Sequence, residues 1–187
     1  MRNSTSGNKE AFKIVIAGCS YSTDDDFRLN KSEPFYSWAR EIGREFECEN
    51  IARHGFSLQE TLERIERSTW DFLIVNLTSI NRGVDGTYPG DRYKQPPRWF
   101  RDQNAQIAQQ IVTQPRCYCW SPFPEWQKSK QVDSIINLSE DELWGSTGEI
   151  TGNHLTRAGN DLLLHHMREK IASASRMAGE LDDAPRN

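Results

Sequence analysis

The stretch Lys13-Ile14-Val15-Ile16-Ala17-Gly18-Cys19-Ser20-Tyr21-Ser22 decides the fold. Its first five residues are mostly apolar and β-branched, which is typical of a buried strand, and Gly18 lets the chain leave that strand through a tight turn. In open α/β sheets, ligands bind at the carboxyl ends of the strands. Ser20 is therefore a candidate nucleophile or phosphate contact, although a serine at such a position can also simply cap a helix.

The rest of the chain alternates between predicted helices and strands. Apolar residues at helical spacing predict helices over residues 33–46, 57–68, 105–112 and 156–174. Apolar runs predict further strands over residues 47–51, 71–77, 116–120 and 134–138. This alternation predicts an α/β fold, a three-layer α/β/α sandwich around a flavodoxin-like, five-stranded parallel sheet in the order 2-1-3-4-5.

Sequence signals also predict how the helices begin and which faces they bury. Ser32 and Pro34 suit the start of the helix over 33–46, and Ser57-Leu58-Gln59-Glu60 is a capping box. The last helix is predicted to bury the apolar residues Leu162, Leu163, Met167 and Ile171. Residues 83–101 are rich in turn formers and aromatics, which predicts a lid or a substrate-contact loop.

Length and composition indicate a single domain. The chain has 187 residues and a net charge of −4, whereas electrostatic nucleic-acid binders usually carry a basic stripe. We expect a disordered leader over 1–10, the domain over 11–174 and a flexible tail over 175–187. The sequence shows neither a membrane-spanning apolar run nor the apolar core of a signal peptide. We therefore expect a cytoplasmic protein with no nucleic-acid or membrane partner, and its oligomeric state stays open.

The four cysteines are expected to be buried free thiols rather than metal ligands. Cys117 and Cys119 form a Cys-x-Cys pair with no nearby histidine or second cysteine pair, which is poor spacing for zinc. We expect neither a metal nor a cofactor.

Four fragments, in chain order, resemble the sequence blocks of one family. Gly18-Cys19-Ser20 resembles a Gly-Asp-Ser block, Gly55 the block-two glycine after the second strand, and Asn81 the block-three asparagine after the third strand. Residues 151–159 resemble an Asp-Gly-x-His-Pro-Asn-x-x-Gly block before the last helix. Together, over roughly residues 12–174, the chain resembles the SGNH (GDSL-like) hydrolase superfamily, and its Gly-Cys-Ser-Tyr-Ser opening is similar to a variant in phage and bacterial members.

This resemblance implies a serine esterase or acyl hydrolase, and it is compatible with a phage-associated protein. Ser20 would be the nucleophile and His154 the base, with an oxyanion hole formed by the Ser20 N–H, the Gly55 N–H and the Asn81 amide. The implied substrate is a small ester, for example an O-acyl group on a carbohydrate.

The chain departs from the family pattern in blocks one and three. Cys19 replaces the block-one aspartate, and Ser79-Ile80-Asn81-Arg82 stands where Gly-x-Asn-Asp is usual. Counted from the start of the strand, Asn81 also lies about one residue late. Thr78 or Ser79 could therefore fill the donor position instead.

A further departure concerns the catalytic triad, because Thr151 stands where the triad aspartate belongs. Glu149, Asp161 or a backbone carbonyl could orient His154 instead, and the sequence does not choose among them.

Two other functions stay open. Thr151 and the aromatic insert over 88–100 also fit a catalytically silent domain of this fold that binds a glycan or a protein partner. A flavodoxin-like nucleotide binder that uses residues 18–22 as a phosphate cradle is less supported, because the chain lacks a glycine-rich fingerprint and a P-loop lysine.

Overall fold

The predicted parallel sheet is confirmed. The structure is a computed structural model that describes residues 12–23, 35–83, 96–126, 128–134 and 155–182. All pairings within the sheet are parallel, and the strand order is β2-β1-β3-β4-β5. The strands are β1 (Ile14–Gly18), β2 (Cys48–Asn50), β3 (Phe72–Asn76), β4 (Cys117–Ser121) and β5 (Val132–Ser134).

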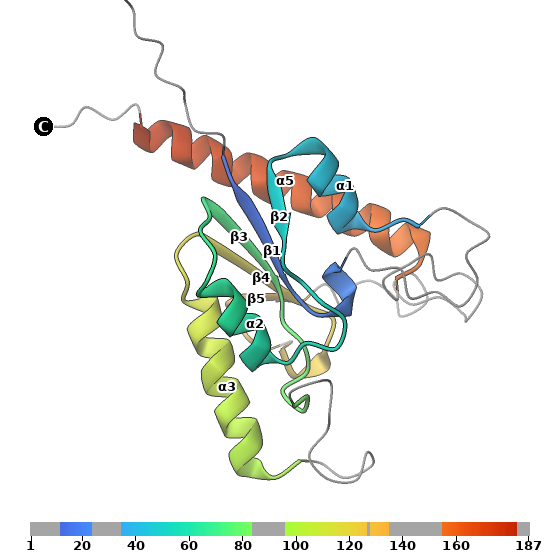
Figure 1. The fold of residues 1–187 in the computed structure, drawn as a ribbon, viewed down its shortest axis with the longest axis vertical. Coiled ribbons are helices and arrows are strands. Elements are labelled where there is room, and N and C mark those ends of the chain that lie inside the picture. The colour runs from blue at the N-terminus through green and yellow to red at the C-terminus, as the bar shows by residue number, and fades with distance from the viewer. Residues whose placement is uncertain (1–11, 24–34, 84–95, 127, 135–154, 183–187) are drawn as a thin grey trace, which may run out of the picture.

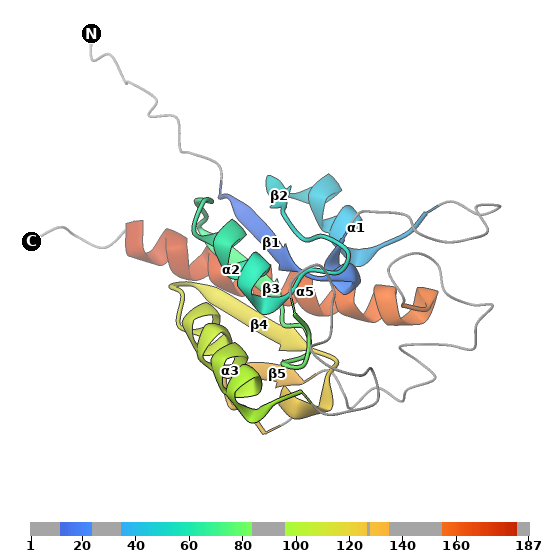
Figure 2. The same ribbon diagram turned by 60° about the horizontal axis from the view of Figure 1, so that its bottom comes forward.

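Helices cover both faces of the sheet, which gives the predicted three-layer sandwich (Figures 1 and 2). The α-helices are α1 (Trp38–Glu45), α2 (Leu58–Ile65), α3 (Arg98–Val112) and α5 (Arg157–Asp182). Two 3₁₀ turns, η1 (Ser20–Ser22) and η3 (Pro124–Trp126), follow β1 and β4. Helices α1 and α5 pack on one face, and α2 and α3 pack on the other.

Alternation along β1 separates the two halves of the core. Ile14 and Ile16 pack with the buried residues of α1 and α5, whereas Val15 and Ala17 pack with those of α2 and α3. Successive side chains in a strand point to opposite faces, so a strand with apolar residues at every position is buried on both sides.

Helix α1 begins later than predicted. Residues 35–37 are not helical, and Ser37 is the N-cap, with its hydroxyl accepting a hydrogen bond from the Arg40 N–H at 3.1 Å. The predicted cap residues Ser32 and Pro34 lie outside the described residues. The capping box of α2 is confirmed, because Ser57 and Glu60 each bind the other's backbone N–H.

Helix α3 begins at Arg98 rather than Ala105, and α5 continues to Asp182, beyond the predicted end at Ala174. Both added segments are polar on several sides, so apolar spacing did not reveal them. Leu162 is 40% exposed, contrary to prediction, because the stripe that faces the core follows Leu163, Met167 and Ile171.

Strand β5 lies earlier than predicted and shares only residue 134 with the predicted range 134–138, whose remainder lies outside the described residues. Its central residue is Asp133, which pairs in register with Trp120. A charged residue in a three-residue strand gives no apolar signal, so the sequence prediction missed it.

The four cysteines form no disulfide. Cys19 and Cys119 are buried as predicted, whereas Cys48 and Cys117 are partly exposed. Within the described ranges, no group of three or more potential ligand side chains could hold a metal ion, and no helix is long and apolar enough to cross a membrane.

Candidate active site

Ser20 lies at the carboxyl end of β1, where the strand order of the sheet reverses. Strand β1 pairs with β2 on one side and with β3 on the other, so the ends of β1 and β3 flank a topological switch point. Gly18 and Asn76 are partners in the register of these two strands. Ser20 begins η1 directly above them and is 3% exposed. This is the place where open α/β sheets bind ligands.

Gly18 is required both by its conformation and by its contact with β3. Its φ angle is +125°, and a Cβ atom at this position would lie 2.5 Å from the carbonyl oxygen of Asn76. Any side chain would be strained and would overlap the neighbouring strand. The glycine therefore lets the chain turn sharply over the end of the sheet and present Ser20.

The Cys19 thiol braces the turn in place of the block-one carboxylate. Cys19 is fully buried, and its Sγ donates a hydrogen bond to Oδ1 of Asn76 at 2.9 Å. Burial raises the pKa of the Cys19 thiol, although the backbone N–H of Tyr21 and the positive charge of Arg82 act in the opposite direction. The thiol stays neutral and can donate, whereas an aspartate here would bring a negative charge into the core.

Gly55 lies in the turn between β2 and α2, as predicted. Its φ angle is +83°, and a Cβ there would meet nothing within 4 Å, so conformation rather than packing favours glycine. The Arg53 N–H donates to the Gly18 carbonyl at 3.2 Å, which ties this turn to the end of β1. No backbone carbonyl of the described residues accepts a hydrogen bond from the Gly55 N–H.

The segment after β3 is held by side chains from three other elements. Ser121 Oγ of β4 donates to the Leu77 carbonyl at 2.7 Å, and Trp126 Nε1 of η3 donates to the Thr78 carbonyl at 3.1 Å. Asn104 Nδ2 of α3 donates to the Ile80 carbonyl at 2.7 Å. Three elements therefore fix the backbone that carries the block-three candidates.

The three block-three candidates differ in their surroundings. Thr78 is buried, and its hydroxyl lies close enough to the Cys19 thiol to lower the pKa of that thiol, against the larger effect of burial. Ser79 Oγ accepts a hydrogen bond from the Asn81 N–H at 3.2 Å, and Asn81 is partly exposed. The structure thus places Thr78 beside the turn that carries Ser20.

His154, Thr151 and Glu149 lie outside the described residues, but the chain directly after His154 is anchored. Leu155 is fully buried in the core. The Thr156 hydroxyl accepts a hydrogen bond from the Gly159 N–H at 2.9 Å, which caps the start of α5.

Hydrogen bonds connect this start of α5 with the turn that carries Ser20. Asn160 Nδ2 donates to the Thr156 carbonyl at 3.1 Å, and Asn160 Oδ1 accepts from the Trp38 N–H at 3.0 Å. Trp38 Nε1 in turn donates to the Tyr21 carbonyl at 2.9 Å. Trp38 therefore links α5 to the residue next to Ser20.

Asp161, one of the candidates to orient His154, already has partners. The Tyr36 hydroxyl donates to its carboxylate, and Arg157 Nε lies 3.3 Å from Asp161 Oδ2. The Arg157 guanidinium also stacks 3.5 Å above the centre of the Tyr36 ring. Burial, reinforced by the Asp161 carboxylate, raises the pKa of Tyr36 to about 12.

Buried polar atoms without hydrogen-bond partners gather near the carboxyl ends of β1, β3 and β4. In the part of the chain that the structure describes, such atoms include Ser22 Oγ, Asn76 Nδ2, Thr78 Oγ1, Arg82 Nε, Arg82 Nη1 and Trp120 Nε1. Each unsatisfied buried group costs about 1–3 kcal/mol. Polar atoms at this edge of the sheet are therefore positioned where they could bind a ligand.

Arg82 is a further candidate site residue that sequence reasoning did not assign. It follows β3, whose last residue pairs with Gly18, and its positive charge lowers the pKa of the buried Cys19 thiol against the larger effect of burial. The available signal was its place in the sequence, because an aspartate is usual there in the family that the chain resembles.

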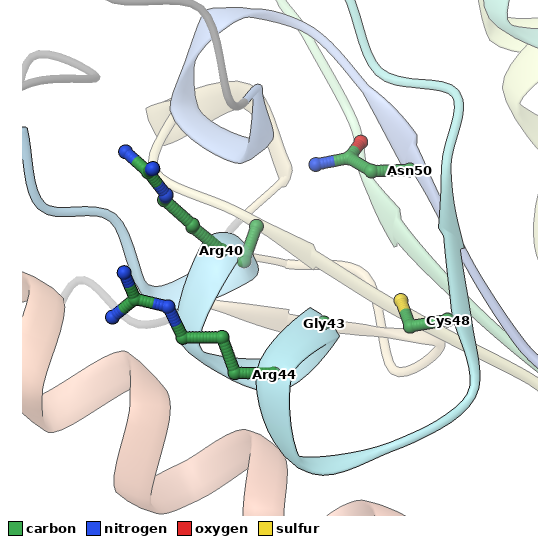
Figure 3. Close-up of a pocket in the computed structure, with 6 residues that line it drawn as sticks. Arg40, Gly43, Arg44, Cys48 and Asn50 are labelled. Carbon is green, nitrogen blue, oxygen red and sulfur yellow. The ribbon is translucent and has the colours of Figure 1, made fainter.

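A separate pocket of about 320 Å³ lies between α1 and β2, lined by Ala39, Arg40, Gly43, Arg44, Cys48 and Asn50 (Figure 3). Arg44 pairs with Glu41 at 2.6 Å, and Arg40 lies 5.6 Å from the centre of the Phe35 ring. Asn50 Nδ2 donates to the Ser22 carbonyl at 2.9 Å. The pocket therefore adjoins η1, but Ser20 does not line it.

No protein-family model matches the sequence, and no curated protein matches it. The fold is similar to that of a protein from Desulfitobacterium hafniense assigned as a lipolytic protein of the G-D-S-L family, with 15% identity and a TM-score of 0.52 over 84% of this chain and 98% of that chain.

Other solved structures give weaker matches. The esterase EstA from Pseudoalteromonas sp. has 13% identity and a TM-score of 0.49 over 86% of this chain and 97% of its own. A lipase/acylhydrolase from Enterococcus faecalis has 13% identity and a TM-score of 0.44 over 88% of this chain and 96% of its own. The Desulfitobacterium match shows that this chain shares the fold of that protein.

Proposed function

We propose that this chain is a serine acyl hydrolase of the SGNH type that cleaves a small ester, such as an O-acyl group on a carbohydrate. The observation that carries the proposal is the position of Ser20 at the switch point of the sheet, at the carboxyl end of β1 next to β3. The similarity in fold to a G-D-S-L family protein supports the same reaction class.

In this proposal Ser20 Oγ attacks the acyl carbon while His154 accepts the serine proton. The tetrahedral intermediate then collapses, and His154 returns the proton to the departing alcohol. Water, activated by His154, hydrolyses the acyl-serine and restores the free hydroxyl. In this proposal the substrate carbonyl and the Ser20 hydroxyl meet at the carboxyl ends of β1 and β3.

The oxyanion of the intermediate would be stabilised by donors from three segments. The Ser20 and Gly55 N–H groups supply two, and the third comes from the segment after β3, either the Asn81 amide or the hydroxyl of Thr78 or Ser79. The hydrogen bonds from Ser121, Trp126 and Asn104 hold that segment, so such a donor would be preorganised.

We also propose that Asp161 does not orient His154, because Tyr36 and Arg157 already engage its carboxylate. Glu149 or a backbone carbonyl would then hold the imidazole. Changing the triad aspartate of a serine protease lowers kcat about 10⁴-fold. We therefore expect slow turnover compared with enzymes that have a complete triad.

The proposal is tested with 4-nitrophenyl acetate, comparing the unmodified protein with Ser20→Ala and with Ser68→Ala as a control. Ser68 lies just beyond α2, and its hydroxyl bonds only locally, to the Arg64 carbonyl at 3.1 Å. We expect Ser20→Ala to lower kcat by about 10³-fold or more, and Ser68→Ala to leave it unchanged. Equal rates for Ser20→Ala and the unmodified protein would overturn the proposal.

A second candidate function is binding of a glycan or a protein partner without turnover. Trp99 favours it, because this large aromatic side chain is 65% exposed at the start of α3. Exposed aromatic residues are typical of recognition surfaces. Binding on a glycan array that survives Ser20→Ala, is lost in Trp99→Ala and is not accompanied by ester hydrolysis would select this function over the first.

A further inference from the structure

Arg82 carries a partly buried positive charge for which the described residues provide no partner. Its Nε and Nη1 atoms are buried and make no hydrogen bond, and no ion pair of its guanidinium is found within the described ranges. Buried charges in proteins are normally paired, because an unpaired one loses its hydration without compensation. The described residues therefore leave room for a negative group to bind the Arg82 guanidinium.

The backbone of Arg82 is fixed, so the side chain cannot simply move away with its loop. The Arg82 N–H donates to the Ser79 carbonyl at 3.1 Å, and Asn104 Nδ2 donates to the Arg82 carbonyl at 3.2 Å. Asn104 is itself buried on α3. Helix α3 thus holds the base of the Arg82 side chain in a defined place.

That place is close to the proposed reaction centre. Arg82 lies in the segment that follows β3, whose last residue Asn76 pairs with Gly18, two residues before Ser20, and its charge acts on the fully buried Cys19 thiol between them. A charge that reaches the residue next to the nucleophile can also reach a group on a bound substrate a few ångströms from the scissile bond.

The sign of this charge is the reverse of what the resemblance implies. Arg82 stands where the block-three aspartate is usual. An aspartate at the site would repel an anion, whereas a guanidinium is well suited to bind a carboxylate or phosphate oxygen. A guanidinium at this place would therefore favour substrates that carry an anionic group.

We propose that Arg82 determines specificity by binding an anionic oxygen, of a carboxylate or a phosphate, that the substrate carries close to its ester bond. This inference rests on the proposed ester hydrolysis and adds the class of ester, namely one with a negative charge on its acyl or alcohol part. Neutral esters are then hydrolysed less efficiently.

The test compares esters matched in size and different in charge. Methyl 4-acetoxybenzoate is paired with 4-acetoxybenzoate, which carries a carboxylate on the alcohol part, and 4-acetoxyphenyl phosphate is the phosphate arm. The second pair is 4-nitrophenyl butyrate, which is neutral, and the 4-nitrophenyl monoester of glutarate, which carries a carboxylate on its acyl part. We expect kcat/KM of the unmodified protein to favour the anionic member of at least one comparison by about 10- to 100-fold.

Variants assign that preference to Arg82. We expect Arg82→Gln to abolish it and Arg82→Lys to retain part of it. The matched control is Arg98→Gln, because the Arg98 side chain is 86% exposed on α3 and pairs only loosely with Asp102 at 3.5 Å. This control should keep the full preference.

A binding measurement separates this inference from the proposed function. Inorganic phosphate and 4-acetamidobenzoate, which is not an ester, should raise the melting temperature of the unmodified protein and of Arg98→Gln but not of Arg82→Gln. Arg82-dependent binding without hydrolysis of any ester would retain the anion site and reject the hydrolase. Ester hydrolysis with no charge preference, or with a preference that survives Arg82→Gln, would overturn the role of Arg82.

Discussion

Two polar clusters on the same sheet differ in how completely their groups are paired. Near β5, Asp133 Oδ2 accepts a hydrogen bond from the Tyr118 hydroxyl at 2.8 Å and lies 3.3 Å from His166 Nε2 and 3.7 Å from Lys170 Nζ. The Tyr118 hydroxyl also contacts His166 Nε2 at 2.7 Å. At the Ser20 turn, by contrast, several buried polar atoms of the described residues have no partner.

We interpret the paired cluster as structural and the cluster at the Ser20 turn as the proposed active site. The paired cluster joins α5 to β4 and β5, and burial together with the Asp133 carboxylate raises the pKa of Tyr118, so its hydroxyl stays protonated and keeps donating. The unpaired groups at the Ser20 turn lower stability and gain nothing unless something binds them. Substitutions should therefore affect stability in the first cluster and activity in the second.

The largest effect is expected from the block-three donor. Removing one oxyanion donor raises the activation barrier by about 2.7–4 kcal/mol. If Thr78 is the donor, Thr78→Val should lower kcat about 10²- to 10³-fold, and if Asn81 is the donor, Asn81→Ala should do so. The unfolding free energy of Thr78→Val should fall only slightly, because its buried hydroxyl has only a weak interaction, with the neighbouring Cys19 thiol. Kinetics with 4-nitrophenyl acetate and urea unfolding measure both quantities. A stability loss without a kinetic effect would contradict this assignment.

Gly18→Ala is expected to have the next largest effect, a loss of unfolding free energy. Strain at φ +125° and overlap with the Asn76 carbonyl should lower the unfolding free energy by about 3 kcal/mol. Gly43→Ala is the matched control, since a Cβ there meets nothing within 4 Å inside α1, and it should stabilise by about 0.5–1 kcal/mol. The urea midpoint should therefore fall for Gly18→Ala and rise for Gly43→Ala. A Gly18→Ala midpoint that does not fall would contradict the close approach of β1 to β3.

Tyr118→Phe should lower the unfolding free energy by about 1–2 kcal/mol, because the Asp133 carboxylate loses a partly buried hydrogen bond. Because this cluster is structural, kcat of the folded variant should stay unchanged. Urea unfolding and ester hydrolysis on the same preparation measure the two values. A large loss of activity at full stability would show that the paired cluster has a catalytic role.

The smallest effect concerns Tyr36 at alkaline pH. Burial and the nearby Asp161 carboxylate raise the pKa of Tyr36 to about 12 in the folded protein, above its ordinary value of 10.0. The resulting stabilisation is present below pH 10 and is lost as the pH rises through 12. The unfolding free energy of the unmodified protein should therefore fall more steeply over this range than that of Tyr36→Phe. Identical slopes would contradict the Tyr36–Asp161 contact.

The sheet was predictable from sequence because its strands are buried on both faces. Apolar runs at β1 and β3 indicated the strands, and Ser57 with Glu60 gave the start of α2. The start of α1 was not predictable, because Ser32 and Ser37 are equally good caps by residue type. Packing of Trp38 against Asn160 of α5 favours the later one.

The candidate site was predictable only in part. Ser20 and Gly55 follow strands, so the order of elements places them at one edge of the sheet. The role of Cys19 as a neutral brace depends on its hydrogen bond with Asn76, which is 57 residues away in the chain and invisible in the local pattern. Arg82 was missed as a site residue because only the structure shows that its buried nitrogens lack partners.

Covalent labelling tests the convergence of distant segments on Ser20 most directly. The protein is treated with a fluorophosphonate, and the modified residue is identified by peptide mass spectrometry, with His154→Gln as the variant that lacks the base. A single adduct on Ser20 that forms much more slowly in His154→Gln is the predicted result. Absence of an adduct, or an adduct on another serine, would contradict the account.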